Sequence, residues 1–393
     1  MFNPHALDLG TRRSCIRELY EYGCQRAAMV GRENVFDYSL GNPSVPSPPE
    51  LTTLLLETIR ETDSVSLHGY TSAAGDYSTR AAIAKELNDR YSWNATPEHF
   101  FLGCGAAPEL SAVFQALTTP GSEFLGLAPY FPEYPVFAQT AGATFRAAPP
   151  ALPDFQIPLE AVEAALTPQT AALVINSPNN PSGVVYTREV LTKLADILRK
   201  KSREYQHPIY LISDEPYREL VYDGADVPFL PAIYPDTVVC YSYSKSLSLP
   251  GERIGYIYVP EAATDSKLLY AAIAGAARAK GHVCAPSLWQ KVIAKATHLR
   301  PNLKAYDENR LLLWESLTAM GYESPKPQGA FYLFVKAPGG DAVAFSEKAK
   351  AKDLLLVPGD GFGCPGYFRM CYCVEKDMIQ RSLPIFEALI QDK

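Results

Sequence analysis

Residues 242–256 read SYSKSLSLPGERIGY and follow directly on the apolar run TVVCYS at 237–242. Lys245 stands among small and hydroxylic residues just after that run, so we expect its ammonium group to be held in a site rather than to extend into water. A lysine in such a setting points to covalent chemistry. A lone lysine beside a loop is more often an ordinary surface charge, so the rest of the chain has to decide between the two interpretations.

Length and composition exclude several classes of protein. The 393 residues predict two domains or one large α/β domain, and 47% of them are hydrophobic. The formal net charge of −7 and the lack of a basic stripe argue against nucleic acid as a partner. No apolar run approaches the roughly 18 residues that span a membrane. The eight cysteines are scattered and no signal-peptide pattern opens the sequence, so we expect a cytoplasmic protein.

The cysteines and histidines do not predict a metal site. Cys371 and Cys373 alternate along the strand-like stretch FRMCYCV, which points both side chains to one face. No CxxC pair accompanies them, and no HExxH spacing occurs among the six histidines. We therefore interpret the two cysteines as buried thiols.

Short apolar runs bounded by turn residues recur through the middle of the chain. They lie at 122–128, 171–177, 208–213, 237–242 and 254–259. Because the runs are continuous rather than alternating, they indicate strands covered on both faces of a largely parallel sheet. Helical patterns lie between them, most clearly at 187–200, where Thr187 is the expected N-cap. Strand followed by helix followed by strand predicts an α/β layer fold.

The two ends of the chain have a different pattern. Residues 11–30 predict one helix, and the proline-rich segment LGNPSVPSPPE at 40–50 reads as a crossing between domains. The later part gives helical patterns at 287–300 and 309–320 and strands at 329–335 and 367–374. We predict a large domain over 46–284 and a smaller α+β domain that combines 1–45 with 285–393.

Polar side chains follow several of the apolar runs, at the carboxyl ends where ligands collect in an open parallel sheet. They are Asn176, Asn179 and Asn180, then Asp214 and Tyr217, then Ser242, Ser244 and Lys245. The turn LGCGAAPEL, which precedes a helical stretch, can offer the backbone N–H groups of Gly105, Ala106 and Ala107 to an anion. Each feature alone is weak, since each fits an ordinary turn. Together they form an acid, a lysine and an anion cradle.

In this order the motifs resemble those of the class I/II aminotransferases, fold-type I enzymes that use pyridoxal phosphate. The matching strings are LGNP (40–43), HGYTSAAGDYSTR (68–80), GCGAAPEL (103–110), APYFPEY (128–134), NSPNNPSG (176–183), SDEPY (213–217), SYSKSLSLPGERIGY and FRMCY (368–372). They cover essentially the whole chain, and SxSK with PGxRxG is the most specific pair. The resemblance implies a large domain with a mostly parallel seven-stranded sheet between helices, plus a smaller α+β domain.

The resemblance also implies roles for the residues. Lys245 forms the Schiff base with the cofactor and then shuttles a proton. Asp214 pairs with the pyridinium nitrogen, so the ring can accept electrons. Tyr217 and Asn180 hydrogen-bond the ring oxygen, and Phe131 stacks on the ring.

Phosphate and substrate contacts are implied in the same way. The phosphate set is Arg253, Ser242, Ser244, the N–H groups of Gly105, Ala106 and Ala107, and Tyr70 reaching across from the neighbouring subunit of a homodimer. Arg369 binds the α-carboxylate of the substrate as a bidentate pair, helped by Asn180 and the backbone of Gly41. No motif fixes a cation for a distal carboxylate, although Arg278, Lys280 and His282 lie in a plausible region.

We therefore expect a cytosolic aminotransferase that moves the amino group of an L-amino acid to a 2-oxo acid, by a ping-pong mechanism through pyridoxamine phosphate. Two alternatives stay open. One is a pyridoxal-phosphate-dependent C–S β-lyase similar to cystathionine β-lyase. The other is a non-catalytic protein that uses a transferase-like fold to sense an effector. The amino donor, the oxo-acid acceptor and the residue that reads the substrate side chain are not given by the sequence.

Overall fold

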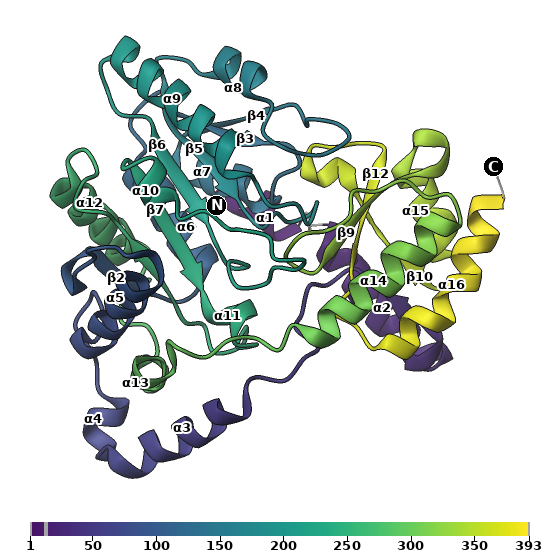
Figure 1. The fold of residues 1–393 in the computed structure, drawn as a ribbon, viewed down its shortest axis with the longest axis horizontal. Coiled ribbons are helices and arrows are strands. Elements are labelled where there is room, and N and C mark those ends of the chain that lie inside the picture. Colours follow the sequence, from purple (N-terminus) through teal and green to yellow (C-terminus); the bar gives the residue numbers. More distant parts are fainter. Residues whose placement is uncertain (1, 12–14, 392–393) are drawn as a thin grey trace.

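The computed structural model describes residues 2–11 and 15–391. A large α/β region surrounds a seven-stranded sheet, and a smaller region at its side carries the last helix of the chain (Figure 1). The strands of the large sheet are β2 (Phe100–Gly103), β3 (Glu123–Leu127), β4 (Thr144–Ala148), β5 (Thr170–Asn176), β6 (Tyr210–Asp214), β7 (Thr237–Ser242) and β8 (Gly255–Tyr258). Their order is β2-β8-β7-β6-β5-β3-β4, and β8 runs antiparallel to both of its neighbours while the other pairs are parallel. This confirms the predicted fold class.

Helices cover both faces of the large sheet, because successive strand residues point to opposite faces and the central strands β5, β6 and β7 are buried along almost their whole length. Ile212 and Cys240 face one layer, which consists of α6 (Ala106–Ala116), α7 (Glu133–Ala141) and α12 (Ser266–Ala279). Leu211 and Val239 face the other. That second layer consists of α3 (Pro49–Glu61), α5 (Tyr77–Tyr91), α8 (Leu159–Ala165), α9 (Arg188–Tyr205), α10 (Leu230–Ile233) and α13 (Ser287–Ala296), with α4 (Ser64–His68) beside α13. The predicted cap is confirmed, since Thr187 Oγ1 accepts from the Val190 N–H at 3.2 Å.

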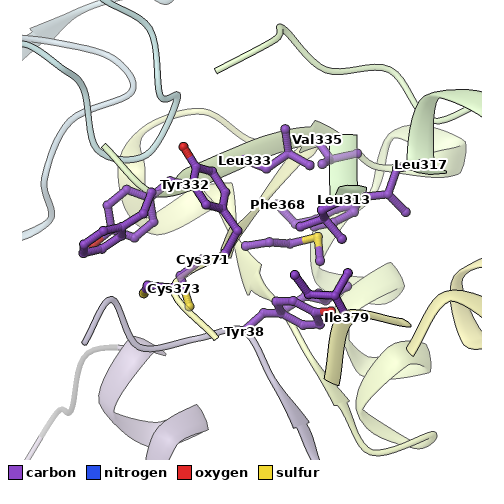
Figure 2. Packing of buried hydrophobic residues seen from close by; sticks show 14 of the residues in the cluster. Tyr38, Leu313, Leu317, Tyr332, Leu333, Val335, Phe368, Cys371, Cys373 and Ile379 are labelled. Atoms are coloured by element: carbon purple, nitrogen blue, oxygen red, sulfur yellow. The ribbon is translucent and has the colours of Figure 1, made fainter. Parts of the chain in front are cut away.

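The smaller region joins the two ends of the chain. Its strands β9 (Tyr332–Lys336), β11 (Val357–Pro358) and β12 (Tyr367–Cys371) form an antiparallel sheet in the order β11-β12-β9, and β1 (Phe36–Asp37) pairs in parallel with β10 (Leu354–Leu355). Its helices are α2 (Cys15–Val30), α14 (Lys304–Ala319), α15 (Ala342–Lys350) and α16 (Lys376–Gln391), whereas α1 (Pro4–Thr11) has no buried residues. Short 3₁₀ turns occur at Arg32–Asn34, Pro97–His99, Pro338–Gly340 and Gly359–Phe362. Tyr38 from the first part of the chain packs in one buried cluster with Leu313 and Phe368 from the last part (Figure 2).

Two details differ from the sequence expectations. The helix predicted at 11–30 is observed as α2, preceded by the separate α1, and residues 12–14 lie outside the described part of the chain. The helical stretch predicted at 287–300 ends earlier, at Ala296, and it packs against α3 and α5 of the large region. The domain boundary between 284 and 285 stays a prediction, and the packing of α13 favours a boundary after that helix.

Candidate active site

Lys245 lies in the one-turn helix α11 (Tyr243–Ser246), which begins directly where β7 ends. Its Nζ donates a hydrogen bond to the carbonyl oxygen of Gly41 at 2.7 Å and lies 5.6 Å from the centroid of the Phe331 ring. Burial lowers the pKa of Lys245 to about 8. A large share of the lysine is therefore an uncharged amine at mildly alkaline pH, which makes it both a nucleophile and a base.

Asp214 ends β6 and is held from two sides. The Tyr134 hydroxyl donates to Asp214 Oδ2 at 2.6 Å, and Asn176 Nδ2 donates to the Asp214 carbonyl oxygen at 2.8 Å. Oδ1 is buried and has no hydrogen-bond partner among the described residues. Burial raises the pKa of Asp214 to about 7, Glu215 adds to the rise, and the hydrogen bond from Tyr134 opposes it. Oδ1 is thus a buried acceptor that lacks a donor.

An anion cradle forms where the turn after β2 enters α6. Gly105 is the N-cap with φ of 92°, a backbone conformation that side chains other than glycine rarely adopt. A Cβ on Gly105 would also lie 2.9 Å from Arg253 Nη2, so the guanidinium packs against the start of the helix. Ala106 and Ala107 form the first turn, whose N–H groups have no partner within the helix. A helix N-terminus and an arginine therefore face the same space.

The two serines of the SxSK motif lie beside this turn. Ser242 and Ser244 are both buried, and their Oγ atoms are 2.6 Å apart. Ser242 Oγ also accepts from the Ser244 N–H at 3.1 Å, which caps α11. The motif therefore fixes the helix that carries Lys245.

Arg369, in β12, is buried within the smaller region. Nη1 donates to Asn180 Oδ1 at 3.1 Å, and Nη2 donates to the carbonyl oxygen of Ser39. The guanidinium carbon lies 4.7 Å from the centroid of the Tyr332 ring. Nε is buried and lacks a hydrogen-bond partner in the described structure. A buried arginine with an unused donor is well suited to receive a carboxylate.

Tyr332 connects the lysine side of the site with the arginine side. Its hydroxyl lies 3.0 Å from that of Tyr217, and either atom could be the donor. A Cβ on Gly41 would overlap the Tyr332 hydroxyl, so only glycine fits there. Neither Tyr332 nor Tyr134 is among the site residues predicted from the sequence. Tyr332 lies in the strand predicted at 329–335 and Tyr134 ends the motif APYFPEY at 128–134, and those two stretches were the available signal.

Five further predicted residues have mixed placements. The Phe131 ring makes an edge contact with Tyr134 at 5.7 Å between centroids, next to Asp214. Tyr70 is 99% exposed, so a single chain does not bring it into the site. Arg278 is exposed at the end of α12, and Lys280 and His282 follow it, half-buried. Nδ1 of His282 is buried without a hydrogen-bond partner in the part of the chain that the structure describes.

The polar groups of the site that lack hydrogen-bond partners in the described structure fit pyridoxal phosphate. Asp214 Oδ1 matches a protonated ring nitrogen, Arg253 and the start of α6 match a phosphate, and Arg369 Nε matches the carboxylate of an amino acid. Residues 2–11 and 15–391 contain no group of three or more His, Cys, Asp or Glu side chains placed to hold a metal ion. Over the same residues, no helix combines the length and the apolar character needed to cross a membrane.

Comparisons with known proteins agree with this fit. Residues 33–384 match the family model described as "Aminotransferase class I and II". Aspartate aminotransferase of Thermotoga maritima is 29% identical over 386 residues, which are 96% of this chain and 97% of the relative. A probable aspartate/prephenate aminotransferase of Thermus aquaticus is 32% identical over 332 residues, or 82% of this chain and 84% of the relative.

Solved structures give the same result. An aminotransferase from Eubacterium rectale is 52% identical, covers 100% of this chain and 99% of its own, and superimposes with a TM-score of 0.98. Aspartate aminotransferase from Thermus thermophilus, solved with maleate, is 26% identical, covers 99% of both chains and has a TM-score of 0.85.

Proposed function

Because the chain belongs to the class I and II aminotransferases, we propose that Lys245, Asp214 and Arg369 are the residues with which it performs their reaction. The chain is an enzyme that uses pyridoxal phosphate to move the amino group of an L-amino acid to a 2-oxo acid in two half-reactions. When bound, the cofactor carries the amino group between the half-reactions and takes up the electrons released at the α-carbon of the substrate. The C–S β-lyase alternative is not favoured, since the matching relatives carry aminotransferase names.

We assign the binding of the cofactor to the residues around the sheet edge. Lys245 would hold it covalently through Nζ, and Asp214 Oδ1 would pair with its ring nitrogen. Tyr217 and Asn180 would hydrogen-bond its ring oxygen, and Phe131 would pack on the ring. The phosphate is held by Arg253, by Ser242 and Ser244, and by the N–H groups of Gly105, Ala106 and Ala107.

Arg369 orients the substrate through its α-carboxylate, with Asn180 and the Gly41 backbone beside it. A carboxylate seated there would satisfy the unused Nε of Arg369. Once the substrate amine displaces it from the cofactor, Lys245 Nζ would accept the proton of the α-carbon and deliver it to the cofactor carbon. Burial suits the free amine to this role, because it lowers the pKa of Lys245 to about 8. One combination of features carries the proposal. The site holds a buried lysine with a lowered pKa together with two buried polar atoms, Asp214 Oδ1 and Arg369 Nε, and neither atom has a hydrogen-bond partner in the described structure.

We further propose that the working unit is a homodimer in which Tyr70 completes the site of the neighbouring subunit. Supporting this, Tyr70 is fully exposed in one chain, and the preceding and following helices α3 to α5 also expose apolar side chains. These are Leu56, Ile59, Val65 and Tyr77. All eight cysteines are free, which supports the proposal of a reducing cytoplasm as its location.

Amino transfer is tested by incubating the protein and pyridoxal phosphate with single L-amino acids plus 2-oxoglutarate, oxaloacetate or pyruvate. We expect the new amino acid to form only when an acceptor is present. Lys245→Ala should lower kcat by at least about 10²–10⁴-fold, the contribution of a positioned general base.

Lys295→Ala, a lysine exposed in an ion pair on α13, is the matched control and should keep full activity. Release of pyruvate and ammonia from cystathionine without an acceptor would instead support the lyase. Full turnover by Lys245→Ala would contradict the assignment of this lysine.

A further inference from the structure

Glu109 is a buried acid that the proposed mechanism does not use. It lies in α6, one turn after Gly105, and its side chain is only 2% exposed. Both carboxyl oxygens are buried, and neither accepts a hydrogen bond of good geometry among the described residues, although the Gly105 N–H lies near enough to favour the ionised carboxyl. Because a buried charge without a partner is strongly unfavourable, a carboxyl in this position requires an explanation.

The surroundings of Glu109 are shaped to admit it. Gly103 and Gly255 are cross-strand neighbours in the antiparallel β2–β8 pair. A Cβ on Gly103 would lie 2.6 Å from Glu109 Oε1, and a Cβ on Gly255 would lie 2.5 Å from the same oxygen. The carboxyl therefore fills the space that two side chains would otherwise occupy. It lies on the face of the sheet that Ile212 and Cys240 share, which is also the face of Asp214, two residues after Ile212.

Two charged groups act on Glu109, namely Asp214 from β6 and Arg253 from the segment before β8. Glu109 in turn raises the pKa of two nearby thiols, Cys240 of β7 and Cys104 of the turn before α6. The buried residues of α12, which also packs on α6, are apolar. Burial is the main cause that raises the pKa of Glu109 well above its ordinary value; Asp214 adds to the rise, and Arg253 and the Gly105 N–H oppose it.

We propose that Glu109 is a proton-bearing acid whose protonation is coupled to cofactor binding, so that the chain binds pyridoxal phosphate tightly only while Glu109 is neutral. This inference rests on the cofactor placement proposed above. There, the phosphate dianion would engage Arg253, the cation that favours ionised Glu109. Phosphate binding would thus leave the surroundings of Glu109 more negative, so it strengthens the hold of Glu109 on its proton. Glu109 is therefore a positioning residue that acts on the cofactor through Arg253.

A measurable consequence is proton uptake. At a pH where Glu109 is partly ionised in the cofactor-free protein, binding pyridoxal phosphate should draw a proton onto it from solution. Replacing Glu109 also changes the field at Asp214, so the proton counts are compared at pH values above the Asp214 pKa of about 7, where Asp214 is ionised in both proteins. The difference between the wild type and Glu109→Gln isolates the proton of Glu109.

We would titrate cofactor-free wild type and Glu109→Gln with pyridoxal phosphate by calorimetry at several alkaline pH values, in buffers with different heats of ionisation. We expect the wild type to take up more protons than the variant, by up to one. We also expect its affinity to fall faster with rising pH, by up to about tenfold per pH unit relative to the variant. Glu123→Gln controls for the loss of a carboxyl. Glu123 is the first residue of β3, away from the carboxyl ends of the strands, so this variant should match the wild type in proton uptake and in the pH dependence of its affinity.

Equal proton counts and parallel pH profiles in the wild type and Glu109→Gln would overturn the inference while leaving the proposed function intact. Failure of the wild type itself to bind the cofactor would instead overturn the proposed function. Should Glu109→Gln not fold, Glu109→Ala provides a second variant without the carboxyl. An infrared difference spectrum of the cofactor-free proteins gives an independent readout: the protonated-carboxyl band of the wild type must be lost in the variant, and its persistence would contradict the assignment.

Discussion

Asp214 and Glu215 are neighbours in sequence but have opposite electrostatic surroundings. Asp214 Oδ1 has no partner among the described residues, and the carboxyl has a pKa near 7. Glu215 is just as deeply buried, yet it accepts from Ser213 Oγ at 2.6 Å and from Arg218 Nε at 2.5 Å. Adjacent residues at the end of one strand therefore belong to two regions, an open site and an ion-paired cluster.

The ion-paired cluster consists of Glu215, Arg218, Glu219, Arg90 and Tyr241. Arg90 Nη1 lies 2.7 Å from Glu219 Oε1, and the Tyr241 hydroxyl donates to Glu219 Oε2 at 2.9 Å. The Arg218 guanidinium carbon lies 4.5 Å from the centroid of the Tyr241 ring. Buried charge is compensated here by the chain itself, whereas the open site leaves its compensation to ligands. The contrast separates a structural use of buried charge from a functional one.

The two regions meet at α11. A helix of four residues is too short to be stable alone, so side chains must hold it. The Ser246 and Tyr241 hydroxyls are 2.9 Å apart, which links the residue after Lys245 to the ion-paired cluster. The cluster thus supports the helix that carries Lys245, the lysine to which we assign the catalytic role.

Of the substitutions that test this contrast, Arg218→Met should have the largest effect on the free energy of unfolding. This change leaves buried Glu215 without its cation, and breaking a buried ion pair in this way costs about 3–5 kcal/mol of stability. Chemical denaturation should show the loss as a lower free energy of unfolding. Arg188→Met is the matched control, because Arg188 pairs with Asp226 on the surface, and it should cost at most about 1 kcal/mol. Equal losses in the two variants would show that the cluster is not specially stabilising.

Asp214→Asn should act in the opposite direction on stability and activity. Under the proposed function Asp214 pairs with the ring nitrogen of the cofactor, so losing its charge should lower kcat by about 10²–10³-fold, as for other preorganised electrostatic groups. The cofactor-free variant should nevertheless be more stable than the wild type at neutral pH. Because the pKa of Asp214 is raised by folding from 3.8 to about 7, its ionisation disfavours the folded state increasingly as the pH rises between those values.

Denaturation of the cofactor-free proteins across this pH range tests the sign. The stability difference should grow from about pH 4 to about pH 7 and then level off. A wild type that is more stable than Asp214→Asn throughout would show that Asp214 is compensated within the chain after all, and the contrast with Glu215 would fail.

The sequence was sufficient for features that depend on local pattern. The run at 237–242 became β7 with the same bounds, and the cap at Thr187 formed as expected. These predictions succeed because continuous burial and helix capping depend on residues that are close together in the sequence. The antiparallel direction of β8 could not be predicted in this way, since an apolar run does not show the orientation of its strand in a sheet.

The site was predictable only where a motif recorded it. Lys245, Asp214 and Arg369 stand in recognisable strings, and the structure brings their surroundings together. Tyr332 and Glu109 depend on long-range packing instead: Tyr332 matters because Gly41, nearly 300 residues earlier, leaves room for its hydroxyl, and Glu109 because two strand glycines face each other. No local pattern identifies a polar group by the space that distant residues leave for it.

The smallest effect tests the link between the two regions. Tyr241→Phe removes one hydroxyl, which should cost about 0.5–1.5 kcal/mol of stability and release Ser246. With α11 held less firmly, water should reach Lys245 more easily, so its pKa in the cofactor-free protein should rise from about 8 toward the ordinary value. Attachment of pyridoxal phosphate requires the neutral amine, so its rate, followed by absorbance, should increase with pH at a higher midpoint than in the wild type.

Tyr210→Phe is the control for this prediction. It removes a comparable hydroxyl on the same sheet, which donates to the Thr264 carbonyl oxygen at 3.0 Å. This variant should lose a similar free energy of unfolding without moving the pH midpoint of cofactor attachment. A shift in both variants, or in neither, would mean that the ion-paired cluster stabilises the fold without positioning the lysine.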